Sequence, residues 1–79
     1  MSGQQPPLAC AQVKAVLVYL GFSFHCQKGT SHEQWKKSGH PGKVTVDCPK
    51  APFSHELIGY MAKQAGVSKK EFYKIHFSL

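Results

Sequence analysis

The sequence predicts an α+β fold in the order α-β-β-β-α, with helices on one face of a three-stranded antiparallel sheet and a short extra C-terminal helix. Apolar residues recur at helical spacing before residue 21 and again after residue 54, and the residues between them alternate as strands do. Clusters of Gly, Pro and Ser separate the strands. The length of 79 residues fits one small domain. We expect residues 1–8 to be a flexible lead-in and residues 9–79 to form that domain.

The first element is a helix over about residues 9–20. Four apolar side chains recur at positions i, i+3, i+4 and i+7 and therefore share one helical face: Val13, Val16, Leu17 and Leu20. Gly21 follows the helix, at the position where a glycine commonly adopts the left-handed conformation that ends it. We therefore expect this face to pack toward the sheet.

The first strand follows the glycine, over residues 22–27. Its apolar and polar side chains alternate, which is typical of a half-buried strand, and Phe22, Phe24 and Cys26 share the face that should be buried. A turn at residues 28–31 then reverses the chain.

Two further strands complete an antiparallel meander. In residues 32–37, Trp35 lies on the face opposite His32, and we expect Trp35 in the core. Residues 38–42 form a turn rich in Gly and Pro. Residues 43–48 form the third strand, in which two valines share one face.

Two helices follow the sheet. Ser54 is a favourable N-cap residue for the longer helix, Gly66 ends it, and five apolar residues form its buried stripe: Leu57, Ile58, Met61, Ala62 and Ala65. Ser68 and Glu71 form a capping box for a short third helix. The apolar residues of that helix are Phe72, Ile75 and Phe77.

The charge composition indicates an anionic partner. Ten basic residues, all of them Lys, stand against four acidic ones, and the formal net charge is +6. This charge favours nucleic acid, an acidic protein or a membrane surface. Because the chain has no Arg, bidentate reading of base edges by Arg is excluded, and contact with phosphates is the better expectation. Sequence-specific DNA binding is therefore disfavoured.

The cysteines predict reduced thiols in a cytoplasmic protein. They are three in number, widely spaced and without a CxxC motif: Cys10, Cys26 and Cys48. A zinc site remains conceivable from four residues whose spacing fits no common motif: Cys26, His32, His40 and Cys48. No signal peptide is visible, and no apolar run is long enough to span a bilayer.

The stretch QKGTSHEQWKK, residues 27–37, predicts a phosphate-binding turn. His32 is the best candidate for proton transfer, because imidazole titrates near neutral pH. Gly29 allows close approach of the backbone, and Thr30 and Ser31 offer hydroxyl and N–H groups to phosphate oxygens. The lysines expected to supply positive charge are Lys28, Lys36, Lys37 and Lys43.

Charge and spacing alone leave a second interpretation open, in which His32 only caps the turn and faces water. The four acidic residues are scattered and form no carboxylate cluster of the kind a two-metal nuclease needs. Three other histidines are expected at surface or turn positions: His25, His40 and His55.

Four motifs occur in a fixed order. They are GF at residues 21–22, QKGTSH at 27–32 with an aromatic residue three positions later, HPG-x-VTV at 40–46 and KQAGVS at 63–68. Together they resemble the HicA toxin family of small messenger-RNA interferases, whose fold is similar to the double-stranded RNA-binding domain. The resemblance covers residues 10 to 72, nearly the whole domain.

The resemblance implies the toxin of a type II toxin–antitoxin system, a metal-independent endoribonuclease that cleaves mRNA without a cofactor. The family's characteristic histidine falls on His32 and its preceding glycine on Gly29. The resemblance also implies a HicB-like antitoxin that covers the His32 face. Many members have Gly-Ser-His where this chain has an additional residue, Thr30, and many have a second His or a basic residue where this chain has Glu33.

Two other functions remain open from the residues. The first is a non-catalytic RNA-binding module of the same fold, in which His32 only contacts phosphate. The second is a protein-interaction subunit whose basic face docks an acidic partner. RNA cleavage that depends on His32 separates the toxin from both.

Overall fold

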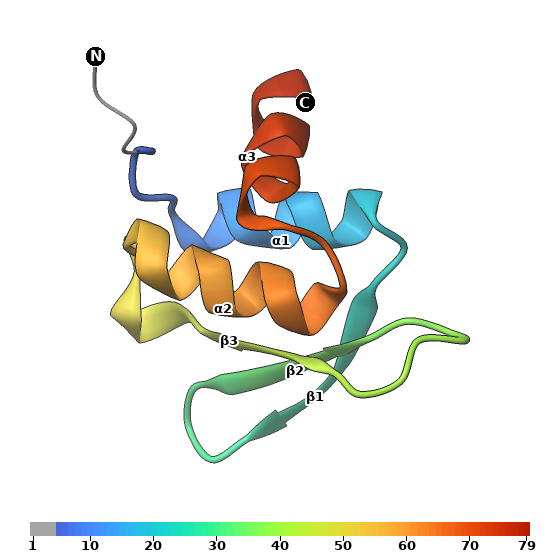
Figure 1. Cartoon of the computed structure of the whole chain (residues 1–79). Coiled ribbons are helices and arrows are strands. Elements are labelled where there is room, and N and C mark those ends of the chain that lie inside the picture. The colour runs from blue at the N-terminus through green and yellow to red at the C-terminus, as the bar shows by residue number, and fades with distance from the viewer. Residues whose placement is uncertain (1–4) are drawn as a thin grey trace.

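The computed structural model describes residues 5–79 and confirms the predicted α+β layout (Figure 1). Its elements are α1 (Cys10–Tyr19), β1 (Ser23–Lys28), β2 (His32–Lys36), β3 (Val44–Asp47), a single 3-10 turn η1 (Cys48–Lys50), α2 (His55–Ala65) and α3 (Lys69–Ser78). Helices α1 and α2 lie on one side of the sheet, and α3 packs against both of them. Among the described residues, no helix is both long enough and apolar enough to cross a membrane.

Helix α1 presents the predicted face to the core. Val13, Val16 and Leu17 are fully buried, and Leu20 caps the helix. The Oε1 atom of Gln12 accepts a hydrogen bond of 2.7 Å from the N–H of Ala9, which satisfies a donor at the start of the helix. The helix therefore begins and ends within one residue of the predicted boundaries.

The sheet has the strand order β1-β2-β3 and is antiparallel throughout. In the β2–β3 register, Trp35 pairs with Val44, and His32 pairs with Asp47. Trp35 and Val44 are buried toward the helices, as predicted. Because side chains alternate along a strand, His32 and Asp47 lie on the outer face, opposite Trp35 and Val44, beside the edge of the sheet that α2 borders.

Strand β1 departs from the predicted alternation. A bulge lies between Phe24 and Cys26, so that Phe24 pairs with the inward Trp35 while Cys26 pairs with Gln34 on the outer face. The residue inserted by the bulge reverses the alternation. Phe22 is buried as predicted, but Phe24 is 52% exposed and meets the Trp35 ring edge to face.

Leu8 belongs to the folded domain and not to the lead-in predicted for residues 1–8. Leu8 is only 1% exposed, and its N–H and C=O exchange hydrogen bonds of 3.1 and 2.8 Å with Phe53. The hydroxyl of Tyr73 donates a hydrogen bond of 2.8 Å to the carbonyl of Pro6. The prediction for residues 6–8 was wrong because Leu8 buries its side chain in the core, whereas residues 1–4 lie outside the described residues.

The cysteine prediction is also corrected. Cys10 and Cys48 form a disulfide, with their Cα atoms 5.3 Å apart, and Cys26 is free. Cys48 is the first residue of η1 and not part of a strand. The separation of 38 residues conceals this pairing in the sequence, because only the fold brings the start of α1 to the end of β3. Disulfides are uncommon in cytosolic proteins, so this finding weakens the argument from cysteines for a cytoplasmic location.

Both C-terminal helices begin at the predicted serines. Ser54 Oγ accepts from the N–H of Leu57 at 3.3 Å, and Ser68 Oγ accepts from the N–H of Glu71 at 3.0 Å. Gly66, with a φ of +84°, ends α2 in the left-handed conformation. Helix α3 extends to Ser78 and buries Tyr73 in addition to the predicted Phe72 and Ile75, whereas Phe77 is exposed.

The buried phenol of Tyr73 makes the free energy of unfolding decrease at alkaline pH. Burial raises the pKa of its hydroxyl above the ordinary 10.0. The unfolded chain therefore ionises first, and stability that is fully present below pH 10 declines as the pH rises toward the folded pKa. We expect Tyr73→Phe to lose about 0.5–1.5 kcal/mol at pH 7 with the hydrogen bond to Pro6.

Urea unfolding followed by circular dichroism at pH 7 and above pH 10 tests this expectation. Both proteins carry Cys26→Ser, which prevents thiol exchange with the disulfide at high pH. The difference in the free energy of unfolding between Tyr73→Phe and its parent should become smaller above pH 10. A difference that stays constant contradicts the assignment.

Candidate functional site

His32 is the first residue of β2 and lies on the outer face of the sheet. It follows the turn at residues 29–31, where Gly29 has a φ of +62° that favours glycine. The cross-strand register places Lys28 on one side of His32 and Asp47 on the other. The side chain of His32 is 55% exposed, so its ring is accessible to a bound molecule.

The imidazole of His32 is paired with a carboxylate. Its Nε2 atom lies 3.4 Å from Oδ2 of Asp47, whose side chain is only 17% exposed. The second oxygen of Asp47, Oδ1, is buried and has no hydrogen-bond partner among residues 5–79. A carboxylate in this position orients a histidine and stabilises the imidazolium that forms when the ring accepts a proton. The pair is therefore suited to general acid–base chemistry.

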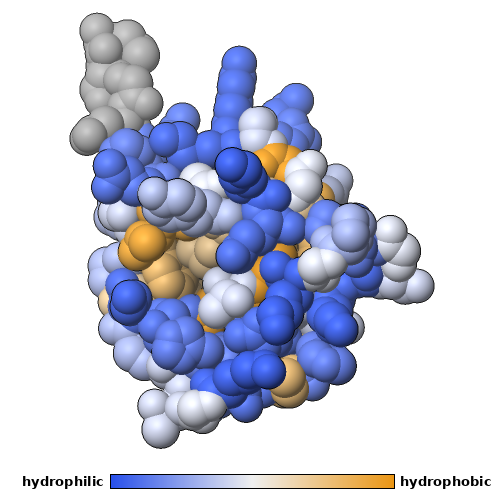
Figure 2. Space-filling model, turned by 60° about the horizontal axis from the view of Figure 1, so that its bottom comes forward, coloured by the Kyte–Doolittle hydropathy of each residue, from blue (hydrophilic) through white to orange (hydrophobic). Residues whose placement is uncertain are grey.

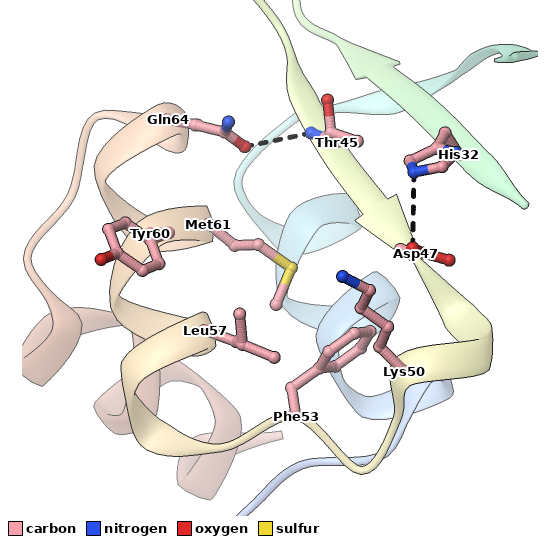
Figure 3. Close-up of a pocket in the computed structure, with 9 residues that line it drawn as sticks. All are labelled: His32, Thr45, Asp47, Lys50, Phe53, Leu57, Tyr60, Met61 and Gln64. Atoms are coloured by element: carbon pink, nitrogen blue, oxygen red, sulfur yellow. Dashed lines mark hydrogen bonds and ion pairs between the residues drawn. The ribbon is translucent and has the colours of Figure 1, made fainter.

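The His32–Asp47 pair forms one wall of a hollow of about 220 Å³ between the sheet and α2 (Figure 3). The polar wall comes from β2, β3 and η1 and consists of His32, Thr45, Asp47 and Lys50. The opposite wall is mainly apolar and consists of Phe53, Leu57, Tyr60, Met61 and Gln64. Figure 2, with the sheet side turned forward, shows hydrophobic atoms within an otherwise mostly hydrophilic surface.

Gln64 fixes α2 against the edge of the sheet. Its Oε1 atom accepts a hydrogen bond of 3.1 Å from the backbone N–H of Thr45 in the edge strand β3. The hydroxyl of Thr45 in turn donates to Oε1 of Gln34, also at 3.1 Å. The bond from Thr45 to Gln64 satisfies a backbone N–H that an edge strand otherwise leaves open, and it holds α2 beside β3.

Of the predicted lysines, only Lys28 lies next to His32. Lys36 is at the other end of β2, about 13 Å away for four residues of extended strand. Lys43 precedes β3 at that same distant end. Lys37 is used by the fold, because its Nζ donates to the carbonyl of Leu20 at 3.1 Å and lies 5.2 Å from the centre of the Phe22 ring.

The remaining predicted residues belong to the turn that precedes His32. Thr30 is exposed, and Ser31 is partly buried, with its carbonyl accepting from the N–H of Glu33 at 3.1 Å. Thr30 and Ser31 therefore lie beside His32, as the sequence predicts for a phosphate-binding turn. No bond in the structure ties their hydroxyls elsewhere among residues 5–79.

Asp47 and Lys50 line the hollow beside His32 although the sequence does not single them out. Asp47 counted as one of several scattered acids, and Lys50 lies 18 positions beyond His32 in the chain. The signal that could have found Asp47 is the predicted antiparallel meander, because pairing the second strand with the third brings the end of one to the start of the other. The position of Lys50 depends on η1, which only the structure shows.

Glu33 has a structural role. Its Oε2 lies 3.0 Å from Nζ of Lys14 in α1, and its Oε1 accepts from Nε1 of Trp35 at 3.1 Å. Glu33 thus faces the helices and holds β2 against α1. It is not on the outer face that carries His32.

The other histidines lie away from the hollow. His25 is exposed in the β1 bulge, as predicted for a surface residue. His40 is held at the end of α2, with its Nε2 2.9 Å from the carbonyl of Gln64, and His55 accepts from Lys69 at 3.1 Å. The conceivable zinc site does not form, because Cys48 is bonded to Cys10, and residues 5–79 contain no cluster of three or more metal-binding side chains.

Comparison with known proteins adds no relative. No family model, no curated protein sequence and no solved structure matches this chain.

Lys37 and Lys43 differ in whether the fold uses their side chains. We expect Lys37→Met to lower the free energy of unfolding by about 1 kcal/mol, because it removes the bond to Leu20 and the contact with the Phe22 ring. Lys43→Met, the matched control, removes an equal charge from an exposed position and should change stability by less than about 0.5 kcal/mol. Urea unfolding curves measure both, and equal losses contradict the assignment.

Proposed function

We propose that this chain is a HicA-like, metal-independent endoribonuclease that cleaves mRNA and acts as the toxin of a type II toxin–antitoxin system in the cytoplasm. The observation that supports the proposal most directly is the exposed His32 ring held by Asp47 on a strand face that also carries Lys28. The four motifs that resemble the HicA family give the same histidine the central role.

Each group around His32 has a part in the proposed reaction. The neutral ring takes the proton of a ribose 2′-OH, and the 2′-oxygen attacks the adjacent phosphorus. The bond from phosphorus to the 5′-oxygen breaks, and the leaving 5′-oxygen takes a proton from water or from the imidazolium. Asp47 orients the ring and stabilises the imidazolium. Lys28 and Lys50 balance the growing negative charge on the phosphate, and the backbone of the 29–31 turn offers N–H groups.

The rate enhancement expected from a single histidine is that of a slow enzyme. One proton-transfer group contributes about 10²–10⁴-fold to the rate. Such a rate is adequate when the substrate is abundant and the outcome is growth arrest. An acidic, HicB-like antitoxin is the proposed protein partner, because a net charge of +6 favours an acidic surface that covers the His32 face.

Cleavage of a labelled mRNA fragment in EDTA tests the proposal. The wild-type protein should cut, His32→Ala should be slower by about 10²–10⁴-fold, and Asp47→Asn should be slower by at least about tenfold because the amide does not stabilise imidazolium. His25→Ala is the matched control, since His25 is also an exposed histidine of the sheet. Its rate should equal that of the wild type.

Circular dichroism of every variant shows whether the fold is retained. Equal cleavage by folded His32→Ala and wild type contradicts the role of His32. Intact RNA that is nevertheless bound by the wild type contradicts the enzyme and favours the non-catalytic RNA-binding module.

A further inference from the structure

The proposed reaction uses only one of the two walls of the hollow. Proton transfer and phosphate binding use the polar wall, whereas the wall formed by α2 is mainly apolar. Leu57 and Met61 line it one turn apart and point into it (Figure 3), and Tyr60 of the same helix borders it. An apolar wall directly opposite a phosphate-binding wall is suited to a ligand that is itself apolar on its faces and charged at one side.

We propose that the hollow between α2 and β3 is a subsite for a single nucleobase of single-stranded RNA, with Tyr60 as its stacking surface. The proposal rests on the proposed function, which places the neighbouring phosphate at His32 and Lys50. It adds the part of the substrate that the hollow selects, an unstacked base.

Tyr60 has the exposure that a stacking residue needs. Its side chain is 67% exposed although it borders the hollow, so its ring is available to a ligand. Most of its apolar neighbours in the wall are more deeply placed, and Phe53 and Met61 are buried beneath. Aromatic rings that lie at the surface next to cationic side chains are the usual platforms for bases of single strands.

The size and the polar groups of the hollow also fit one base. Its volume of about 220 Å³ is below the range of about 300–1,000 Å³ typical of sites for larger ligands. The Gln64 amide uses its oxygen for Thr45, which leaves its NH₂ group as a donor at the wall. A base edge offers acceptors for such a donor, in the way single-stranded RNA is commonly read.

The charges at the rim favour RNA over an apolar peptide as the occupant. Lys50 lines the hollow, Lys28 flanks His32 on the adjacent strand, and the whole chain carries a net charge of +6. The carboxylate of Asp47 is mostly buried and paired with His32, which limits its repulsion of a phosphate. A phosphate at the rim and a base against α2 together match both walls.

The test measures RNA binding in a His32→Ala background, which keeps the RNA uncut. The probe is a fluorescein-labelled, single-stranded RNA dodecamer of mixed sequence, followed by fluorescence anisotropy. We expect Tyr60→Ala to weaken binding by about 5- to 150-fold, the range for loss of one stacked base. Tyr60→Phe retains the ring and should bind within about twofold of its parent.

Tyr19→Ala is the matched control, because Tyr19 is 65% exposed on α1 and does not line the hollow. It should leave binding unchanged. If Tyr60→Ala binds RNA as tightly as Tyr19→Ala, the base subsite is overturned, and the hollow is then open to a protein partner. Both variants replace exposed side chains, and circular dichroism checks that they fold.

The result is separable from the proposed nuclease activity. If RNA binding depends on Tyr60 and the wild-type protein cuts no RNA, the subsite is supported and the nuclease is contradicted. Cleavage that depends on His32, with RNA binding indifferent to Tyr60, supports the nuclease and overturns the subsite.

Discussion

The pairing of β2 with β3 in a single register is the constraint on which both the core and the candidate site depend. This register turns Trp35 and Val44 toward the helices and turns His32 and Asp47 to the outer face. A shift of one residue would exchange the two faces, exposing the valines and burying the polar pair. Burial of the apolar face therefore also determines which ionisable groups meet outside.

Contacts on the inner face and at the β3 edge of the sheet hold that register in place. On the inner face, Glu33 joins Lys14 of α1 and Trp35 of its own strand. A carboxylate that is largely buried is tolerable because it is paired with a cation and a hydrogen-bond donor. At the outer edge, Gln64 binds the backbone of Thr45. The helices thus position the strands that carry the candidate chemistry, although they supply none of its ionisable groups.

Local patterns predicted the elements, whereas long-range contacts determined the departures from prediction. Helix boundaries followed from apolar spacing and from Ser54 and Ser68, because N-caps act within four residues. The β1 bulge, the Cys10–Cys48 disulfide and the placement of Lys50 in the same hollow as His32 each depend on residues far apart in the chain. His32 was found from its turn, but its partner Asp47 requires knowledge of strand pairing.

The chemical ends left on cleaved RNA show whether the ribose 2′-OH is the nucleophile, as proton transfer to His32 requires. Mass spectrometry of the fragments identifies these ends. We expect a 2′,3′-cyclic phosphate on one fragment and a 5′-hydroxyl on the other, because the 2′-oxygen displaces the 5′-oxygen. Fragments with 5′-phosphate and 3′-hydroxyl ends would contradict it, since water and not the ribose would then be the nucleophile.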